Sequence, residues 1–314
     1  MRPTLRQLEY IVAVARLGQF GLAAEALNVS QPSLSAQISA VEEDLGTRLF
    51  KRGRAGAQPT AMGAEVIRRA QRILGEVDDL RAAVTGGVPF GGRLRLGVLP
   101  SIGPYLLPKA VSAIHRTQPS LRVIVREENT RDLEQGLKAG RFDMIISTPE
   151  DHPNTHQVRL FSERLWIAAA LDDPLAAESG PVDGNSLRGR IFLTLDSGHR
   201  LSRIVYALAS GFGGVVADDY EGTSLDSIRL MAASGAGVAV LPELYTLRQP
   251  QGHSEVIFRP LAAEGASRDI ALLQRAGEES QTGTAFVSAA LLDVARGFGL
   301  NIREADPAAS PDGQ

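Results

Sequence analysis

The sequence contains no cysteine among its 314 residues. This absence excludes disulfide bonds, thiolate metal sites and chemistry based on a reactive thiol. The chain also lacks an uninterrupted apolar run of about 18 residues, the length that a helix needs to cross a bilayer. The opening segment, MRPTLRQLEY, lacks the charged region and following apolar region of a secretory signal. From these absences we expect a cytoplasmic protein without membrane contact.

The remaining composition is that of an ordinary globular protein, with 44% hydrophobic and 22% charged residues. The length allows two or three domains. The net charge of -3 argues against a uniformly basic nucleic-acid binder. Any contact with DNA would therefore have to come from a local concentration of basic side chains.

The stretch LNVSQPSLSAQISAVEEDLGTRLF, residues 27–50, predicts a helix that begins after Ser30. Serine is a good N-cap, proline is tolerated in the first turn, and Gly46 supplies the C-terminal stop. The apolar stripe consists of Leu34, Ile38, Val41 and Leu45. The opposite face carries Pro32, Ser35, Ala36, Ser39 and Glu43, so its N-terminal part is small and neutral.

Two shorter amphipathic segments precede this helix. The first has its apolar stripe at Leu5, Leu8, Ile11, Val12 and Ala15, and the second at Phe20, Ala23, Ala24 and Leu27. Only two residues separate the second segment from the helix after Ser30, which predicts a helix-turn-helix. In that motif the second helix enters the major groove with its N-terminus first, and small side chains permit close approach. An ordinary helical hairpin with a serine cap is the alternative.

A basic segment without acids follows directly and favours DNA binding. It contains Arg48, Lys51, Arg52 and Arg54 among glycines, and it closes at Pro59. Such a segment suits a wing that grips phosphates or the minor groove. A merely solvated charge run would usually mix signs.

These residues resemble the LysR-type transcriptional regulators. The pattern consists of Phe20-x-x-Ala23-Ala24-x-x-Leu27, Ser30-Gln31-Pro32-Ser33-Leu34-Ser35-x-Gln37-Ile38, Leu45-Gly46-x-x-Leu49-Phe50-x-Arg52 and Thr60-x-x-Gly63. The resemblance, together with the helical wheel, suggests DNA contacts at Ser30, Gln31, Pro32, Ser33, Ser35, Ala36, Gln37, Arg52 and Arg54. Many relatives have arginine at the position of Ala36. We therefore expect fewer guanine contacts here and more reliance on thymine methyl groups and DNA shape.

A long helix is predicted after Thr60. Its apolar residues follow a heptad spacing and would form a dimerisation seam, at Val66, Ala70, Ile73, Val77, Leu80 and Val84. A helix packed only on its own domain would usually show a wider stripe. The glycine-rich break that follows, GGVPFGG, predicts a hinge.

Beyond the hinge, strand and helix patterns alternate. Strands are predicted at 93–99, 121–127, 143–148, 165–171, 190–195, 238–242 and 269–275, with helices at 104–117, 130–139, 199–210, 224–234 and 284–298. This alternation predicts parallel sheets covered by helices, arranged as two hinged lobes. The overall expectation is an α+β multidomain protein: an all-α winged helix-turn-helix (1–60), a linker helix (61–86), a hinge (87–92), a two-lobed α/β effector domain similar to periplasmic binding proteins (93–300), and a disordered tail (301–314). Lobe I would comprise 93–162 and 268–300, and lobe II 163–267.

Open α/β sheets bind ligands at the carboxyl ends of their strands, against helix N-termini. Four places match: Pro100-Ser101, Asn129-Thr130, Asp196 to Arg200, and Gly222-Thr223. Each hydroxyl taken alone is also explained as a plain helix cap. Arg200 is harder to explain, because a cation is unfavourable at the positive end of a helix dipole and requires an anionic partner. That partner is either a bound oxyanion or a nearby acid such as Asp196, which would fill the cleft.

This half resembles the same family's sensor domain, and more closely its peroxide-sensing OxyR branch, through PSIGPYLLP, LDSGHR and GTSLDSIRLMAASGAGVAVLP. In that branch a reactive cysteine follows the histidine and a partner cysteine lies nine residues further on. Here those positions hold Arg200 and Ala209, so a thiol switch is excluded. The effector-site candidates are Ser101, Thr130, His199, Arg200 and Thr223, with a ligand other than peroxide.

An enzyme and a solute-binding transport protein are the rival interpretations. We find no nucleophile elbow or phosphate-binding loop, and Gly235-Ala236-Gly237 lacks the third glycine of a dinucleotide fingerprint. His152 and His156 have metal-like spacing, but Pro153 makes a solvent loop the better interpretation. A transport protein would need an export signal and has no use for a helix-turn-helix. We therefore expect a bacterial transcription factor without enzymatic activity, cofactor or metal, acting as a dimer or tetramer on dyad-symmetric operator DNA. A small effector, with an anion as the candidate class, would control its influence on RNA polymerase.

Overall fold

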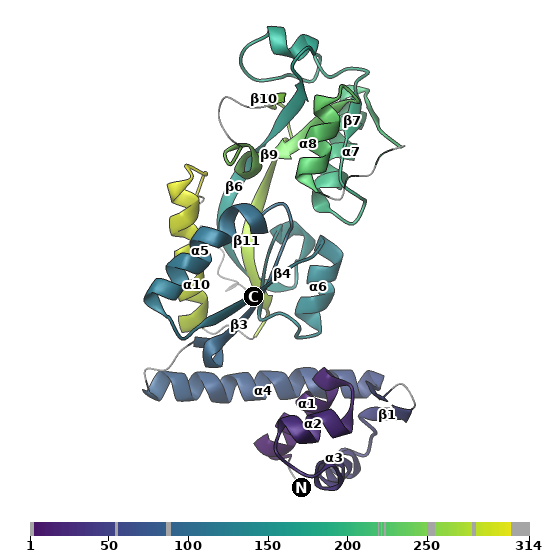
Figure 1. Ribbon diagram of the computed structural model, residues 1–314, viewed down its shortest axis with the longest axis vertical. Coiled ribbons are helices and arrows are strands. Elements are labelled where there is room, and N and C mark those ends of the chain that lie inside the picture. The colour runs from purple at the N-terminus through teal and green to yellow at the C-terminus, as the bar shows by residue number, and fades with distance from the viewer. Residues whose placement is uncertain are drawn as a thin grey trace, which may run out of the picture. The chain divides into compact units, whose positions relative to one another are not determined.

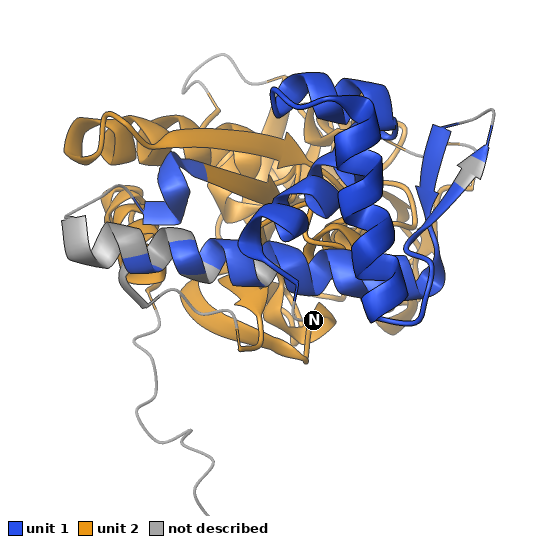
Figure 2. Cartoon of the chain, turned by 90° about the horizontal axis from the view of Figure 1, so that it is seen from below, with its two compact units in different colours: residues 1–93 blue, residues 94–314 orange. Residues whose placement is uncertain are grey.

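Residues 1–93 form a mainly helical unit, and residues 94–314 form a unit built on a mixed β-sheet (Figures 1 and 2). The computed structural model describes residues 3–53, 56–85, 89–218, 220, 222, 224–249, 255–277 and 281–302. The elements of the first unit are α1 (Leu5–Leu17), α2 (Phe20–Ala26), α3 (Gln31–Asp44), β1 (Phe50–Gly53), β2 (Gly56–Pro59), α4 (Ala61–Thr85) and η1 (Pro89–Gly92).

The predicted start of α3 is confirmed. Ser30 has an extended backbone, and its hydroxyl accepts a hydrogen bond from the Ser33 N–H at 3.3 Å. Leu34, Ile38 and Val41 are buried, but Leu45 is 41% exposed. The expectation for Leu45 was wrong because the helix ends at Asp44, and Leu45 is already the C-cap, turned away from the buried face.

The segment Thr60-x-x-Gly63 joins the start of α4 to the residues before β1 by a close backbone approach. The Thr60 hydroxyl donates to the Arg48 carbonyl at 2.7 Å and accepts from the Gly63 N–H at 2.8 Å. A Cβ at Gly63 would lie only 1.9 Å from the Leu49 carbonyl oxygen, a distance that no side chain tolerates. Glycine is required here because the backbones touch.

The second unit has two lobes that share the long strand β6 (Thr155–Ala170). Lobe I contains β3 (Arg93–Val98), α5 (Gly103–Thr117), β4 (Arg122–Glu127), α6 (Thr130–Lys138), β5 (Met144–Ser147), η2 (Pro149–Asp151), β11 (Ser267–Arg275) and α10 (Gln281–Gly297). Lobe II contains η3 (Pro174–Ala177), β7 (Ile191–Leu193), α7 (Arg200–Phe212), β8 (Val215–Val216), α8 (Leu225–Ala233), β9 (Val238–Pro242), α9 (Glu243–Thr246) and β10 (Val256–Pro260). Helices α5 and α10 lie on one side of the lobe I strands and α6 on the other (Figure 1).

The sheet is mixed, so the expectation of purely parallel sheets was wrong. The strand order is β4-β3-β5-β11-β6-β9-β7-β8, with β10 also pairing with β6. The pairs β3–β5, β7–β8 and β7–β9 are parallel, as the alternating pattern predicts. The strands that carry the chain between the lobes, β6 and β11, pair antiparallel with each other and with their other neighbours. Two antiparallel crossings allow the chain to leave lobe I and return to it.

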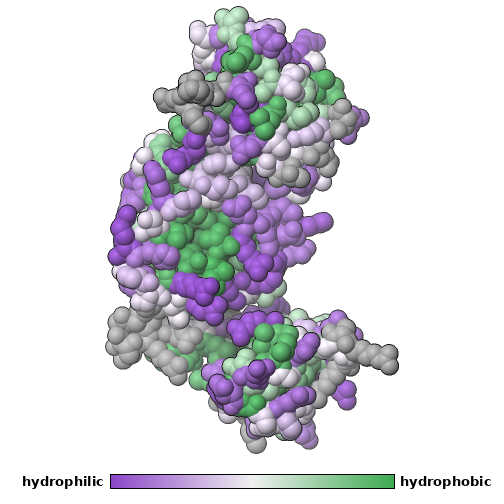
Figure 3. All heavy atoms as spheres, viewed as in Figure 1, coloured by the Kyte–Doolittle hydropathy of each residue, from purple (hydrophilic) through white to green (hydrophobic). Residues whose placement is uncertain are grey.

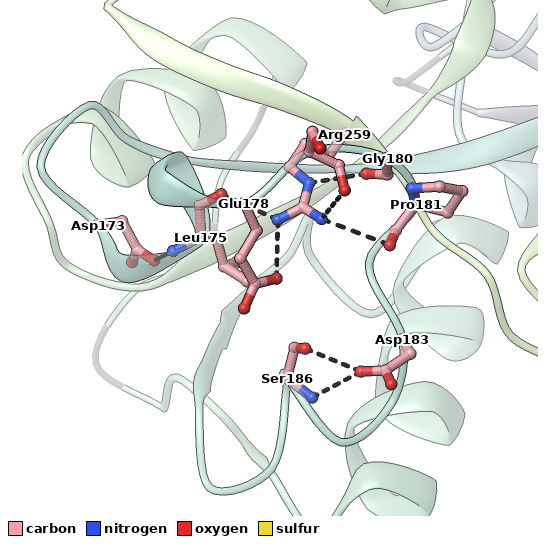
Figure 4. Close-up of polar contacts among 9 residues, drawn as sticks. Asp173, Leu175, Glu178, Gly180, Pro181, Asp183, Ser186 and Arg259 are labelled. Carbon is pink, nitrogen blue, oxygen red and sulfur yellow. Dashed lines mark hydrogen bonds and ion pairs between the residues drawn. The ribbon is translucent and has the colours of Figure 1, made fainter.

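Lobe II is closed at one end by a loop organised around the buried Arg259 of β10. Its guanidinium donates to the carbonyl oxygens of Leu175 (2.9 Å) and Gly180 (2.8 Å) and pairs with Glu178 at 3.3 Å (Figure 4). These bonds satisfy backbone carbonyls in η3 and in the loop that follows it. Arg259 therefore has a structural role.

The end of the described chain differs from expectation. Asn301, predicted to begin a disordered tail, accepts a hydrogen bond from the Ser162 N–H at 2.8 Å and forms an isolated β-bridge with it. The predicted tail from residue 303 onward lies outside the described residues.

Candidate DNA-reading helix and lobe-junction site

The N-terminal edge of α3 presents the small polar surface that the sequence predicts. Ser30, Gln31, Pro32, Ser33, Ala36 and Gln37 are exposed, and Ser35 is half-buried. The Gln37 amide oxygen accepts a hydrogen bond from Gln7 Nε2 of α1 at 3.0 Å, which fixes its orientation. No charged side chain occupies these positions. The edge can therefore approach base edges closely and offer hydroxyl and amide groups to them.

The predicted wing is a two-stranded antiparallel hairpin, β1–β2, in which Arg52 lies opposite Ala57. The Ala57 N–H donates to the Gly18 carbonyl at 2.7 Å, and this bond ties the hairpin to the end of α1. The side chain of Arg52 and the whole of Arg54 lie outside the described residues.

The candidate dimerisation residues of α4 fall into two groups. Val66 packs against the core of its own unit, and Ala70 is only 1% exposed. Ile73 and Leu80 are 42% and 64% exposed, and Val77 is half-buried. Of the candidate seam residues that the structure describes, the exposed ones thus begin at Ile73. The side chain of Val84 lies outside the described residues.

Three of the effector-site candidates are buried: Ser101, Thr130 and His199. The backbone N–H of Arg200, the first residue of α7, donates to the hydroxyl of Thr130, the first residue of α6, at 3.3 Å. This bond crosses from lobe II to lobe I and brings two helix N-termini together. Thr223 lies outside the described residues, although the next residue, Ser224, caps α8.

The anionic partner of Arg200 is Asp151 of η2. Arg200 Nη1 lies 3.1 Å from Asp151 Oδ1, and Arg203 Nη2, one turn later in α7, lies 2.7 Å from the same oxygen. The expectation that a nearby acid could hold Arg200 was correct in kind, but Asp196 was the wrong residue. Asp196 accepts from the Gly198 N–H at 2.9 Å and faces His199 Nε2 at 3.4 Å.

Asp151 was not among the predicted site residues, although the sequence carries a signal for it. Asp151 follows the third predicted strand of lobe I by three residues, so it also lies at the carboxyl end of a strand. The same rule that selected Ser101 and Thr130 would have selected it. The pairing across the lobes could not be read from the sequence, because it depends on how the lobes meet.

His199 is held in its neutral form at the junction. Burial lowers the pKa of its imidazole, Asp196 opposes this effect, and the charge of Arg268 adds to it. Arg268 itself forms a buried ion pair with Glu163, 2.7 Å between Nη2 and Oε1, and the two residues lie opposite each other on β11 and β6. The pKa of the Glu163 carboxyl is raised by burial, against the attraction of Arg268. The crossing strands thus carry charged groups next to the candidate site.

His152 was predicted to lie in a solvent loop, and this was wrong. Its side chain is 2% exposed, and Nε2 lies 3.0 Å from the Ser147 hydroxyl. Its carbonyl accepts hydrogen bonds from Gln157 and Thr155, which turn the segment inward. His156 is exposed on β6. Among the described residues, no group of three or more histidine or acidic side chains could hold a metal ion.

Two family models match this chain. The model "Bacterial regulatory helix-turn-helix protein, lysR family" matches residues 5–64, and the "LysR substrate binding domain" matches residues 89–295. The chain belongs to the LysR family of transcriptional regulators. As a member of this family it is a DNA-binding regulator with an effector-binding domain, and not an enzyme. No helix in the described part of the chain is long and apolar enough to span a membrane.

Relatives of this LysR regulator include two curated bacterial proteins. It is 33% identical to the "Hydrogen peroxide-inducible genes activator" of Haemophilus influenzae, over 92% of this chain and 96% of the relative. It is 32% identical to the "DNA-binding transcriptional dual regulator OxyR" of Escherichia coli K12, over 87% and 90%.

Solved structures show the same likeness. A full-length OxyR variant from Pseudomonas aeruginosa has a TM-score of 0.77 and 28% identity, covering 93% of this chain and 98% of that one. Full-length BenM has a TM-score of 0.59 and 26% identity, covering 96% and 100%. This LysR regulator is thus similar to OxyR proteins, but it has no cysteine and cannot be a cysteine-based peroxide sensor.

Proposed function

We propose that this LysR regulator reads a dyad-symmetric operator with the N-terminal edge of α3, and that a small oxyanion bound beside Arg200 controls it. The observation that carries the DNA part is the exposed, uncharged edge from Ser30 to Gln37, followed by a basic hairpin. Phosphate contacts from the hairpin would set the register, while the α3 edge would discriminate bases. The lack of arginine at Ala36 favours contacts with thymine methyl groups and indirect readout.

The effector part rests on the chemistry around Arg200. The N-termini of α6 and α7 meet at the bond from the Arg200 N–H to the Thr130 hydroxyl, and the Arg200 guanidinium projects from the same first turn of α7 to Asp151. Helix N-termini and a guanidinium both favour a negative charge. The Arg200–Arg203 pair already holds one carboxylate, that of Asp151. A carboxylate or another oxyanion is therefore the ligand class that the site fits best. Ser101 and His199 would supply further polar contacts from either lobe.

Self-association would place two DNA-reading heads on one operator. The exposed Ile73 and Leu80 of α4 support a helix-to-helix seam. In lobe I, apolar surface lies over α5, and β4 leaves Val125 37% exposed at the end of the strand order (Figure 3). Two separate apolar faces are consistent with a dimer that pairs further into a tetramer. Effector binding would then change the spacing of the heads and the access of RNA polymerase.

Three substitutions in the intact chain test the DNA assignment. Ser35→Arg and Gln31→Ala should change the operator preference, because both positions would face base edges. Arg52→Ala should weaken binding to all sequences and reduce the salt dependence, since a wing contact to phosphate carries no sequence information. Footprinting and salt titrations on matched operators measure both effects, and circular dichroism verifies the fold. Unchanged footprints in all three variants would mean that α3 is not the recognition helix.

A further inference from the structure

The contact between Asp151 and α7 joins the two lobes by charge. Asp151 belongs to η2 of lobe I, and Arg200 and Arg203 belong to the first turn of α7 in lobe II. The Asp151 side chain is 7% exposed, so it is enclosed by the lobes, whereas Arg200 and Arg203 keep 30% and 54% of their side-chain surface. The Asp151 carboxylate is thus buried, whereas the two guanidinium groups remain accessible to a ligand from solvent.

The Asp151 carboxylate is held in a fixed orientation. The Thr148 hydroxyl donates to Oδ2 at 2.7 Å, and the Asp151 N–H donates to the Thr148 carbonyl at 3.3 Å. The remaining oxygen, Oδ1, faces both arginines. A carboxylate fixed in this way loses little conformational freedom when it pairs with them, unlike an ordinary surface acid. Its neighbour Glu150 is exposed on the same short helix.

We propose that Asp151 is an internal competitor for the effector: its carboxylate occupies the Arg200–Arg203 pair and latches the lobes until an oxyanion displaces it. This inference rests on the proposed effector site and adds how that site is regulated. Two guanidinium groups against one carboxylate leave an excess positive charge, which attracts a second anion. Because each guanidinium has five N–H donors, an incoming oxyanion can bind before Asp151 leaves. Displacement then removes a tether between the lobes.

The latch has a measurable consequence for affinity. A ligand that must displace a competing internal group binds more weakly. Its apparent dissociation constant is the intrinsic one divided by the fraction of molecules in which the site is free. Partly exposed ion pairs are individually weak, and two of them together correspond to about a fivefold effect on binding. Asp151→Asn removes the competing charge but keeps an oxygen that can accept from Thr148. Glu150→Gln is the matched control, since it removes a neighbouring charge that is exposed.

Amide hydrogen exchange on the full chain tests the latch without any ligand. Asp151→Asn should accelerate exchange in residues 148–152 and in the first turn of α7, because the lobes are less firmly joined. Glu150→Gln should leave exchange as in the wild type. Equal exchange in the wild type and both variants would overturn the latch, whatever the effector is.

Titration calorimetry with inorganic phosphate, at constant ionic strength, tests the competition. We expect Asp151→Asn to bind phosphate about fivefold more tightly than the wild type. Glu150→Gln should match the wild type, and Arg200→Ala should lose binding. Equal affinity in the wild type and Asp151→Asn would overturn the competition but leave the oxyanion site standing. Phosphate binding that is absent from all variants, or that persists in Arg200→Ala, would overturn the oxyanion site and the competition with it.

Discussion

At the scale of single residues, the buried His152 beside the latch makes stability depend on pH. Burial lowers the pKa of its imidazole; Asp151 and Glu134 oppose this shift, and Lys138 and Arg203 add to it. Since the folded pKa lies below the unfolded value of about 6.5, both states are neutral above that pH and the full stability is present. As the pH falls through about 6.5, the unfolded chain binds the proton first, so the free energy of unfolding decreases.

We therefore predict that His152→Gln makes stability less sensitive to acid. The slope of the unfolding free energy between pH 7.5 and 5.5 should fall by up to about 1.4 kcal/mol per pH unit. Urea unfolding, followed through the fluorescence of Trp166, the single tryptophan and part of β6, reports on the unit that contains His152. His115→Gln controls for the loss of an exposed imidazole. An unchanged slope in His152→Gln would contradict the prediction.

The residues that the sequence located are those whose role depends on a local pattern. Ser30 caps a helix through the Ser33 N–H, three positions on, and this role follows from its immediate neighbours. Gly63 was located only as part of the family pattern, because its backbone contact is with Leu49 in the segment before β1. Asp151 was missed because its partners, Arg200 and Arg203, lie far along the chain on α7. His152 was misplaced because Pro153 indicated a loop, whereas its ring is buried against the Ser147 hydroxyl. Arg200 is an intermediate case. Its position at a helix N-terminus predicted an anionic partner, but the sequence did not identify that partner as Asp151.

At the scale of elements, the two halves of α4 differ in burial, and we have proposed a different packing role for each. Its first half packs on its own unit through Val66 and Ala70, and its second half exposes Ile73 and Leu80. The heptad pattern did not distinguish these roles, because both need apolar residues at the same spacing. A helix that first packs on its domain and then leaves it satisfies one continuous stripe.

We predict that Ile73→Asp and Leu80→Asp each shift dimers toward monomers, because like charges would face each other across the seam. Operator binding by the full chain should weaken with the loss of dimers, while the melting temperature of the DNA-binding unit should change little at these exposed positions. Gly75→Asp is the control, since Gly75 lies on the opposite face of α4 and no atom outside the helix approaches it. Analytical ultracentrifugation measures the association. Undiminished association in both seam variants would place the interface elsewhere.

The same scale shows which strands a pattern can predict. The strands β5, β9 and β11 contain continuous apolar runs, β3 begins with alternating arginine and leucine, and all four were located to within a few residues. The first half of β6 was missed because HQVRLFSER mixes charged and apolar residues, and its buried Glu163 is paired with Arg268 on the partner strand. β10 was also not predicted, and a charged residue is again one reason. Its Arg259 is buried and donates hydrogen bonds to backbone carbonyls of another segment. Strands whose charges are satisfied by tertiary partners look like loops in a sequence.

At the scale of the whole molecule, this regulator differs from the relatives whose names describe a response to hydrogen peroxide, because it contains no cysteine. Ala209, the second cysteine position of the OxyR branch, is buried in the core of lobe II, and Arg200 is paired with Asp151. The fold of the sensor is retained, but both positions of a thiol switch have other structural roles. At the first of these positions the structure shows a charged contact between the lobes, Arg200 with Asp151.

We therefore predict that micromolar hydrogen peroxide leaves the operator footprint of the full chain unchanged. No thiolate is present, and the four methionines are oxidised much more slowly. Among the methionines that the structure describes, Met62 is 53% exposed at the start of α4 and would react first, whereas Met144 is fully buried. Any effect at far higher peroxide should persist after treatment with a thiol reductant and disappear in Met62→Leu, because sulfoxide needs a reductase for repair. A footprint that changes at micromolar peroxide and is restored by a thiol reductant would contradict this prediction.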